Sequence, residues 1–264
     1  MRILRGWQQP LNNAPAPPWT PLDLGTKLSA WWDASDSSTM VVEGGKVSSW
    51  TDKKASITVA QTTAERQPTF EAGGLNGHDC VRFDGVATAL LTNTGAASLP
   101  TGDEAGSIWG LISKDTPAAT GGYFLGYGNA SESGSRRVGA NTSNRWVGLA
   151  GNGTGVFSAI NNYGLAGGIA AVSAFYDSTG VRMQANKGPI VSNTGAVATG
   201  TNGWLSMGTP NNSTGFWGGR VSDIVIVQGA LTEQESNQLW NYLRTKGGDE
   251  TWIPEDLGDK VRLW

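Results

Sequence analysis

The sequence predicts an all-β domain that ends in one short helix. The chain has 264 residues, of which 38 are Gly and 16% are charged, so Gly is about twice as frequent as the roughly 7% of an average protein. From residue 28 to about residue 227, short apolar runs alternate with Gly, Asn, Ser and Thr, which is typical of many strands joined by turns. All-β sandwiches of this length commonly form one domain. The composition excludes a coiled coil and a charge-rich disordered chain.

Residues 1–18 precede the predicted strands and contain four prolines. Such a composition favours extended backbone and cannot build a core alone. We therefore expect 1–18 to be an anchoring arm in front of a domain over 19–248, followed by an extension over 249–264. The residues expected to contact a partner protein lie in the arm and the extension: Arg2, Ile3, Leu4, Trp7, Trp252 and Trp264.

Seven apolar runs are the clearest predicted strands. The second half of the chain also predicts a hairpin, because the β-rich run 171–177 and the run 181–185 flank a short connection that contains Gly. The seven runs are 81–83, 107–112, 123–127, 170–176, 181–185, 204–207 and 221–227.

One helix is predicted over 231–245. Thr232 and Glu235 have the spacing of a capping box, in which each side chain satisfies the other residue's backbone N–H. Leu239 and Leu243 fall one turn apart on a single face, and two glycines follow as a stop signal.

The last residues repeat an earlier segment. Residues 252–264 match residues 19–31 at Trp, Pro, Asp, Leu, Gly, Lys and Trp, with an offset of 233. Two interpretations stay open: a reused edge segment, or the beginning of a second similar domain in a longer protein. Both predict an ordered strand over 19–31, and we expect 252–264 to pack on a neighbouring chain or on the domain's own surface.

Several motifs follow one another in a characteristic order. They are Leu28-Ser-Ala-Trp-Trp-Asp-Ala-Ser-Asp36, Val47-Ser-Ser-Trp-Thr-Asp-Lys53, Gly74-Leu-Asn-Gly77, Val81-Arg-Phe-Asp-Gly85, the hairpin 176–188, Gly219-Arg-Val-Ser-Asp-Ile-Val-Ile226, Ala230-Leu-Thr232 and Tyr242-Leu243. Together they resemble the bacterial and phage group of concanavalin A-like, LamG-type jelly-roll domains, over about 28–247. The resemblance implies two antiparallel sheets packed face to face, with their apolar sides forming the core.

Candidate catalytic residues are few. A jelly roll hosts many functions, and retaining glycosidases of this fold type use two carboxylates about 5 Å apart on one strand. The predicted strands carry no such Glu-x-x-Glu motif, and Asp103, Glu104 and Glu132 fall in turns. The single histidine, His78, is expected to be solvated or to cap a turn, and Cys80 to be a small buried residue. We therefore expect no enzymatic activity.

A metal site is not assigned. One Cys and one His cannot assemble a zinc site. LamG-type relatives often hold Ca²⁺ at the rim, which implies that Asp33, Asp36 and Asp52 could supply some oxygen ligands. The same side chains could instead cap turns. We expect no cofactor and leave calcium open.

The 12 tryptophans point to sugar recognition, because indole faces stack on sugar rings. Trp31, Trp50 and Trp109 lie in apolar runs and are expected in the core, whereas Trp217 flanks loop sequence. The candidate ligand-binding patch, expected to be exposed, consists of Arg145, Trp146 and Tyr163.

Charge and targeting signals limit the partners that we expect. The pI is near 5.2 and the 19 basic residues are spread along the chain, so we expect neither nucleic acid nor an anionic membrane as partner. No secretory h-region and no apolar stretch of about 18 residues occurs, so we expect assembly in a cytoplasm.

These features lead to one functional hypothesis and two alternatives. The hypothesis is a non-enzymatic bacteriophage virion or adhesion protein, such as a capsid decoration protein, head fibre or tail fibre, that contacts a host-surface glycan. It would be exposed on the virion, homo-oligomeric, and attached to other virion proteins through its arm. The alternatives are a lectin-like carbohydrate-binding module of a bacterial surface or secreted protein, and a divergent glycoside hydrolase.

Overall fold

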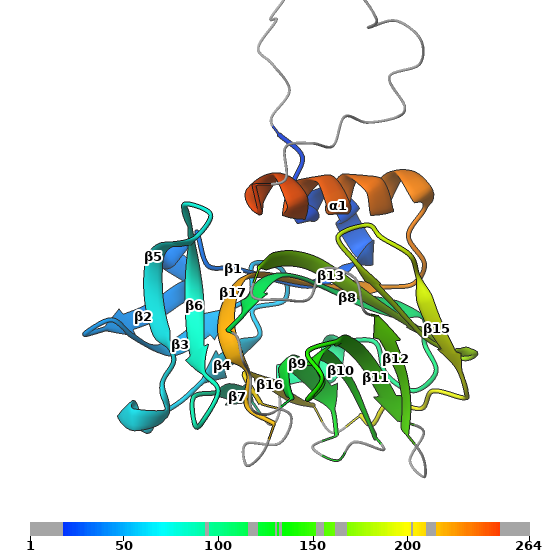
Figure 1. Ribbon diagram of the computed structural model, residues 1–264, viewed down its shortest axis with the longest axis horizontal. Coiled ribbons are helices and arrows are strands. Elements are labelled where there is room, and N and C mark those ends of the chain that lie inside the picture. Colours follow the sequence, from blue (N-terminus) through cyan, green and yellow to red (C-terminus); the bar gives the residue numbers. More distant parts are fainter. Residues whose placement is uncertain are drawn as a thin grey trace, which may run out of the picture.

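The computed structural model describes residues 18–92, 95–115, 121–129, 131, 134–151, 156–161, 168–201, 203–209 and 215–248. Within these ranges the protein is all-β with one α-helix, as the sequence predicts (Figure 1). The helices are η1 (Pro21–Lys27), η2 (Ser37–Thr39), η3 (Ala64–Arg66), η4 (Gly95–Ser98) and α1 (Glu233–Lys246). The strands are β1 (Leu28–Asp33), β2 (Met40–Glu43), β3 (Lys46–Thr51), β4 (Thr58–Ala60), β5 (Thr69–Leu75), β6 (His78–Asp84), β7 (Leu90–Thr92), β8 (Gly106–Lys114), β9 (Gly122–Gly128), β10 (Ser135–Ala140), β11 (Trp146–Gly151), β12 (Val156–Asn161), β13 (Ile169–Asp177), β14 (Gly180–Ala185), β15 (Val191–Thr194), β16 (Trp204–Met207) and β17 (Gly218–Gln228).

The strands form one continuous hydrogen-bonded sheet of 17 strands. The expected jelly-roll sandwich of two separate sheets is therefore wrong. The reason lies in short linking strands: β9 pairs with β16, β16 with β7, β7 with β4, and β4 with β3. β3 in turn pairs with β5, and β5 with β6. From there β6 pairs with the long strand β17, which also pairs with β8 and β1. The sheet thus curls so that β8, β13 and β17 arch over β9–β12 (Figure 1).

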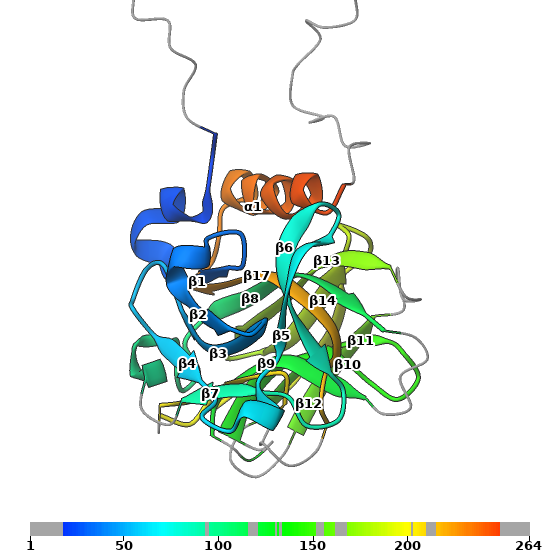
Figure 2. The same ribbon diagram turned by 90° about the vertical axis from the view of Figure 1, so that its left-hand side faces the viewer.

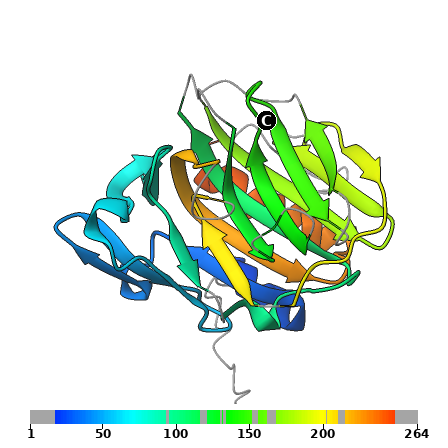
Figure 3. The same ribbon diagram turned by 90° about the horizontal axis from the view of Figure 1, so that it is seen from below.

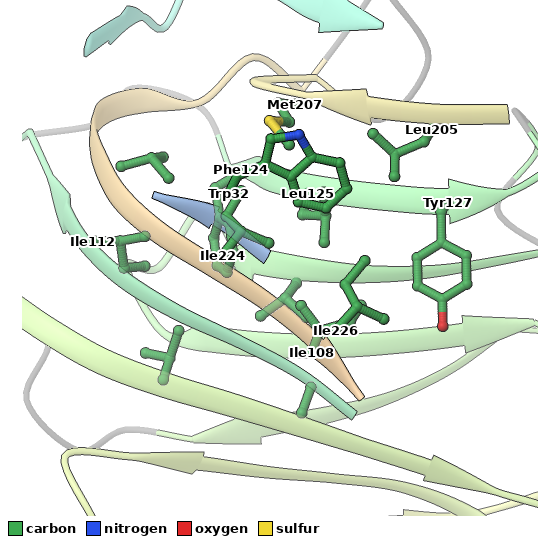
Figure 4. Packing of buried hydrophobic residues seen from close by; sticks show 14 of the residues in the cluster. Trp32, Ile108, Ile112, Phe124, Leu125, Tyr127, Leu205, Met207, Ile224 and Ile226 are labelled. Atoms are coloured by element: carbon green, nitrogen blue, oxygen red, sulfur yellow. The ribbon is translucent and has the colours of Figure 1, made fainter. Parts of the chain in front are cut away.

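The sheet buries apolar side chains on both of its faces. Trp32, Ile108 and Ile224 point into the main core inside the curled sheet (Figure 4). Their chain neighbours Trp31, Trp109 and Val225 point to the opposite face and form a second core under α1. Because successive side chains on a strand point to opposite faces, β1, β8 and β17 supply both cores at once.

Helix α1 covers the outer face of the arch. It lies on the side of β8 and β13 that faces away from β9–β12, as the view from below shows with the green strands in front and the orange helix behind (Figure 3). Leu239, Trp240 and Leu243 are the buried residues of α1, and the Trp240 and Trp109 rings meet edge to face with centroids 5.0 Å apart. These contacts fix the helix on the sheet.

The predicted elements agree with the structure in most places. All seven apolar runs lie in strands, the hairpin is β13–β14 with Asp177 opposite Gly180, and the predicted helix is α1, with the capping box of Thr232 and Glu235 formed. The segment over 19–31 begins with η1 rather than a strand, and only its end belongs to β1.

Several expectations are not tested by these ranges. The arm over 1–17 and the expected partner contacts Arg2, Ile3, Leu4, Trp7, Trp252 and Trp264 lie outside the described residues. The domain bounds, the homo-oligomer and the excluded nucleic-acid and membrane partners stay predictions. None of the described helices is long and apolar enough to cross a membrane.

The start of α1 is tied to η1 beside it (Figure 2). Lys27 Nζ lies 2.7 Å from Glu235 Oε2, and the Thr232 N–H donates to the same oxygen at 2.7 Å. The hydrogen bond from Lys27, together with those from Thr232, lowers the pKa of Glu235 to about 2.

We predict that Glu235→Gln lowers the unfolding temperature at neutral pH, and that this deficit shrinks as the pH falls from 4.5 toward 2. A carboxyl group whose pKa is lowered by folding stabilises the protein above its unfolded pKa and loses that contribution as it becomes protonated. Differential scanning calorimetry across this range measures the gap. Glu233→Gln, an exposed acid in the same turn, is the control, and a deficit independent of pH would contradict the assignment.

Candidate functional site

A pocket of about 420 Å³ opens between α1 and the segment around Trp19. The residues of α1 that line it, from Gln238 to Lys246, belong to the C-terminal part of the helix. We call it the Trp19 pocket. Three parts of the chain line it: the segment before η1, the start of β6, and α1. The lining residues are Pro18, Trp19, Thr20, His78, Gln238, Asn241, Tyr242, Thr245 and Lys246.

Helix periodicity explains why α1 can supply most of the lining. Gln238, Asn241, Tyr242 and Thr245 follow the spacing i, i+3, i+4 and i+7, which places them on one face of a helix. The buried residues of α1 alternate with them and face the sheet. The helix therefore carries an apolar face toward its core and a polar, aromatic face toward the pocket.

Two aromatic rings form the apolar wall of the pocket. Trp19 and Tyr242 meet edge to face, with centroids 6.2 Å apart. Tyr242 in turn packs edge to face on the buried Trp31, with centroids 6.0 Å apart. Because both lining rings also pack against the second core, their faces are held in place before any ligand arrives.

One buried polar atom of a lining residue has no hydrogen-bond partner among the described residues. Asn241 Oδ1 is buried, and no hydrogen bond to it is formed in the part of the chain that the structure describes. Buried polar atoms are almost always hydrogen-bonded, so Oδ1 is an unsatisfied acceptor behind the lining, which a ligand donor reaches when the Asn241 side chain turns toward the pocket. The side chains of Gln238, His78 and Thr245 add further donors and acceptors to the same lining.

Charged side chains beneath the pocket hold Lys246. Its Nζ lies 2.8 Å from Asp33 Oδ1 and 2.8 Å from Asp223 Oδ2. The Tyr242 hydroxyl and Trp31 Nε1 donate to the other oxygen of Asp223, at 2.9 Å and 3.3 Å.

These contacts shift the pKa values of Lys246 and Tyr242. Burial lowers the pKa of Lys246, but the charges of Asp223 and Asp33 outweigh the effect of burial, so that the pKa of Lys246 is raised. Burial and the same two carboxylates raise the pKa of Tyr242.

Lys53 links this arrangement to a third aspartate, Asp36. Its Nζ lies 3.4 Å from Asp33 Oδ2 and 3.0 Å from Asp36 Oδ2, and 4.3 Å from the centroid of the Trp31 ring. The hydrogen bond from Ser38 lowers the pKa of Asp36. We call Asp33, Asp36, Lys53, Asp223 and Lys246 the Lys246 cluster.

The residues considered for calcium are engaged otherwise. Asp33 and Asp36 pair with lysines in the Lys246 cluster. Asp52 accepts from the backbone N–H groups of Lys54, Ala55 and Ile57 at 2.7, 2.8 and 2.5 Å. Over the ranges that the structure describes, no three His, Cys, Asp or Glu side chains are grouped to hold a metal. These carboxylates thus act as turn caps and ion-pair partners.

The predicted ligand patch is not formed as expected. Trp146 is only 1% exposed and stacks in the main core against Trp217, with ring centroids 6.1 Å apart. The expectation that it is exposed is wrong, because β11 turns this side chain inward. Arg145 is half-buried at the start of that strand, and Tyr163 lies outside the described residues, so a binding role for these two stays a prediction.

Sequence reasoning missed the Trp19 pocket. It identified the helix and the Trp19 segment separately, and it took His78 as a solvated or capping residue. The usable signal was the second face of α1, where an amide, a phenol and a hydroxyl recur at helical spacing. Nothing in the sequence indicates that η1 brings Trp19 against that face.

A second group of charged residues lies on β5, β6 and β17 and directly after β8. Arg82 contacts Glu71 at 3.4 Å and Asp115 at 2.9 Å, and Arg220 contacts the same two residues at 2.6 Å and 3.5 Å. The two carboxylates therefore lie close to each other, separated by guanidinium groups.

Comparisons with known proteins show what the fold is similar to. No protein-family model and no curated protein sequence matches the chain. A Trypanosoma rangeli sialidase in complex with 2,3-difluoro-KDN is similar with a TM-score of 0.57 and 12% identity, over 85% of this chain and 34% of the sialidase. An arabinofuranosidase complexed with arabinofuranosyl-α-1,2-xylobiose is similar with a TM-score of 0.52 and 13% identity, over 83% of this chain and 59% of that enzyme. The chain thus spans about a third and about three fifths of these proteins.

These similarities correct the family and function predicted from the sequence. Both of these solved structures are described as glycosidases, a sialidase and an arabinofuranosidase, and not as phage-type concanavalin A-like or LamG domains. This finding contradicts three predictions made from the sequence. They are the assignment to that family, the function as a bacteriophage virion or adhesion protein, and the absence of enzymatic activity. Identity this low shows a shared fold only, so an activity has to be argued from the residues of this chain.

We predict that Lys246→Met lowers the free energy of unfolding by about 3–5 kcal/mol, because it leaves two buried carboxylates without their shared cation. Urea titration at pH 7 measures the loss. Adding Asp223→Asn to this variant should recover part of the lost stability, since one of the two buried carboxylates without a cation is then removed. Lys54→Met, at an exposed lysine, is the control, and an equally small effect of both lysine changes would contradict the prediction.

Trp146→Ala should cost about 3–5 kcal/mol of stability, as expected for a large aromatic side chain removed from a packed core. Chemical denaturation monitored by circular dichroism measures this. A loss below about 1 kcal/mol would show that the side chain is exposed in solution.

Proposed function

We propose that this chain binds a saccharide in the Trp19 pocket, as the sugar-recognising part of a carbohydrate-processing protein. The observation that carries the proposal is the composition of the lining, in which two fixed aromatic rings stand beside neutral amide and hydroxyl groups. Aromatic faces stack on the C–H faces of sugar rings, and amides and hydroxyls hydrogen-bond the ring hydroxyls. Asn241 Oδ1, which has no partner among the described residues, becomes an acceptor for one of these hydroxyls when the side chain turns toward the pocket.

The similarity in fold supports the same class of ligand. The sialidase and the arabinofuranosidase are described in complex with a sugar derivative and an oligosaccharide, respectively. For the present chain a saccharide ligand is a proposal, and the pocket's own residues are its main support.

Glycoside hydrolysis is the second candidate function, favoured by the neighbouring carboxylates Glu71 and Asp115. Glycosidases use two carboxyl groups, one of which donates a proton to the leaving group. Both carboxylates here contact Arg82 and Arg220, an arrangement suited to ion pairing. The Trp19 pocket is therefore the better-supported site.

We predict that Trp19→Ala weakens saccharide binding at least about tenfold, which corresponds to about 1.4 kcal/mol, because the stacking wall is lost. Asn241→Ala should weaken binding less, because it removes one acceptor. A glycan array identifies the ligand, and isothermal titration calorimetry measures its affinity. Val86→Ala, at a residue that is 73% exposed, is the control for truncating an apolar side chain outside the pocket.

The outcomes separate the two candidates. Unchanged affinity in Trp19→Ala, with the unfolding temperature preserved, would place the binding site elsewhere. Release of reducing ends that disappears in Glu71→Gln or Asp115→Asn, while Trp19→Ala retains it, would establish hydrolysis at the other site.

A further inference from the structure

We infer that the Trp19 pocket selects neutral saccharides and excludes sugars that carry a carboxylate. This inference rests on the proposed function and names the class of ligand for the same site. It follows from the ion pairs and hydrogen bonds that the charged groups at the pocket already form within the protein.

Lys246 is the only Lys or Arg among the described residues that line the pocket. An ammonium group has three N–H donors. Lys246 Nζ has three oxygen partners, namely Asp33 at 2.8 Å, Asp223 at 2.8 Å and the Tyr242 hydroxyl at 3.4 Å. No donor of Lys246 is left for a ligand carboxylate.

The Lys246 cluster also carries an excess of negative charge. Three aspartates, Asp33, Asp36 and Asp223, are balanced by only Lys53 and Lys246, so the cluster has a formal charge of −1. A further carboxylate is bonded to a lining residue, since Asp23 accepts from the backbone N–H of Thr20 at 2.7 Å. Thr20 itself lines the pocket. An anionic ligand therefore approaches uncompensated negative charge.

The groups that remain free to bind are neutral. Gln238, Asn241 and Thr245 present amides and a hydroxyl on one face of α1, and no donor to Asn241 Oδ1 occurs among the residues that the structure describes. An acceptor satisfies a sugar hydroxyl but repels a carboxylate oxygen. A carboxylate placed here would lose its water without gaining a charged partner, which is costly.

The test uses pairs of sugars that differ only at C6. Oligosaccharides of glucose and galactose carry CH₂OH there, and those of glucuronic and galacturonic acid carry a carboxylate. Affinities of the full chain are measured by isothermal titration calorimetry at low salt and pH 8, where an ordinary imidazole is neutral. One uncompensated charge about 10 Å away changes affinity by about 2- to 15-fold, depending on the local dielectric. We expect the neutral member of each pair to bind at least about fivefold more tightly.

A matched pair of variants assigns the preference to the Lys246 cluster. Asp36→Asn removes one negative charge at a side chain that is 32% exposed, and it should narrow the neutral-to-acidic ratio about two- to fivefold. Asp177→Asn removes one charge from the β13–β14 hairpin, near the opposite end of α1, and should leave the ratio unchanged.

Each outcome has a distinct meaning. A neutral preference that narrows in Asp36→Asn alone supports the inference. Equal or tighter binding of the acidic sugars overturns it and leaves saccharide binding in place. A neutral preference that is the same in both variants overturns the role given to the cluster. Binding of no sugar from either series overturns the proposed function and the inference together.

Discussion

The ion pairs of Lys246 are the interaction on which the site depends. They join the last turn of α1 to β1 and β17 through a cation and two carboxylates that are at most 10% exposed. Charges this deeply buried are tolerated only when they are fully paired and hydrogen-bonded. The positions of Asp33, Asp223 and Lys246 are therefore mutually determined, and so is the place of the Tyr242 ring, whose hydroxyl joins the same network.

The second core makes this arrangement possible. An arch that buried only its inner face would leave its outer face to solvent, and α1 would have nothing to pack on. In β1, β8 and β17 apolar residues occupy both faces, so Trp31 and Trp109 face the helix while Trp32 and Ile108 face inward. This packing holds α1 still, and the polar face of the helix becomes a rigid wall of the pocket. Binding to a preformed wall avoids the entropy cost of ordering it.

The sequence predicted the local elements better than their connection. Strands, hairpin and helix follow from short-range signals such as the Thr232 and Glu235 capping box, whereas the closure of the sheet depends on β4 and β7, which are only three residues each and carry little periodicity. Trp146 was misplaced for a related reason: loop-like neighbours suggested exposure, but the first residue of β11 points into the core. The Trp19 pocket joins residues more than 200 positions apart, so no local pattern could reveal it.

The segment over 19–31 shows what the repeat at 252–264 preserves. Trp19 packs on Tyr242, Leu24 is buried in the second core, Lys27 pairs with Glu235, and Trp31 donates to Asp223. All four residue types recur in 252–264. The exposed Leu22 is replaced by Glu, and the buried Leu28, Ser29 and Ala30 are replaced by Val, Arg and Leu. The repeat therefore keeps the residue types that tie 19–31 to α1 and β17, but it does not keep the buried residues at the start of β1. A strand with Arg in place of Ser29 and Leu in place of Ala30 would need a differently shaped core, because buried positions tolerate changes of volume and charge poorly.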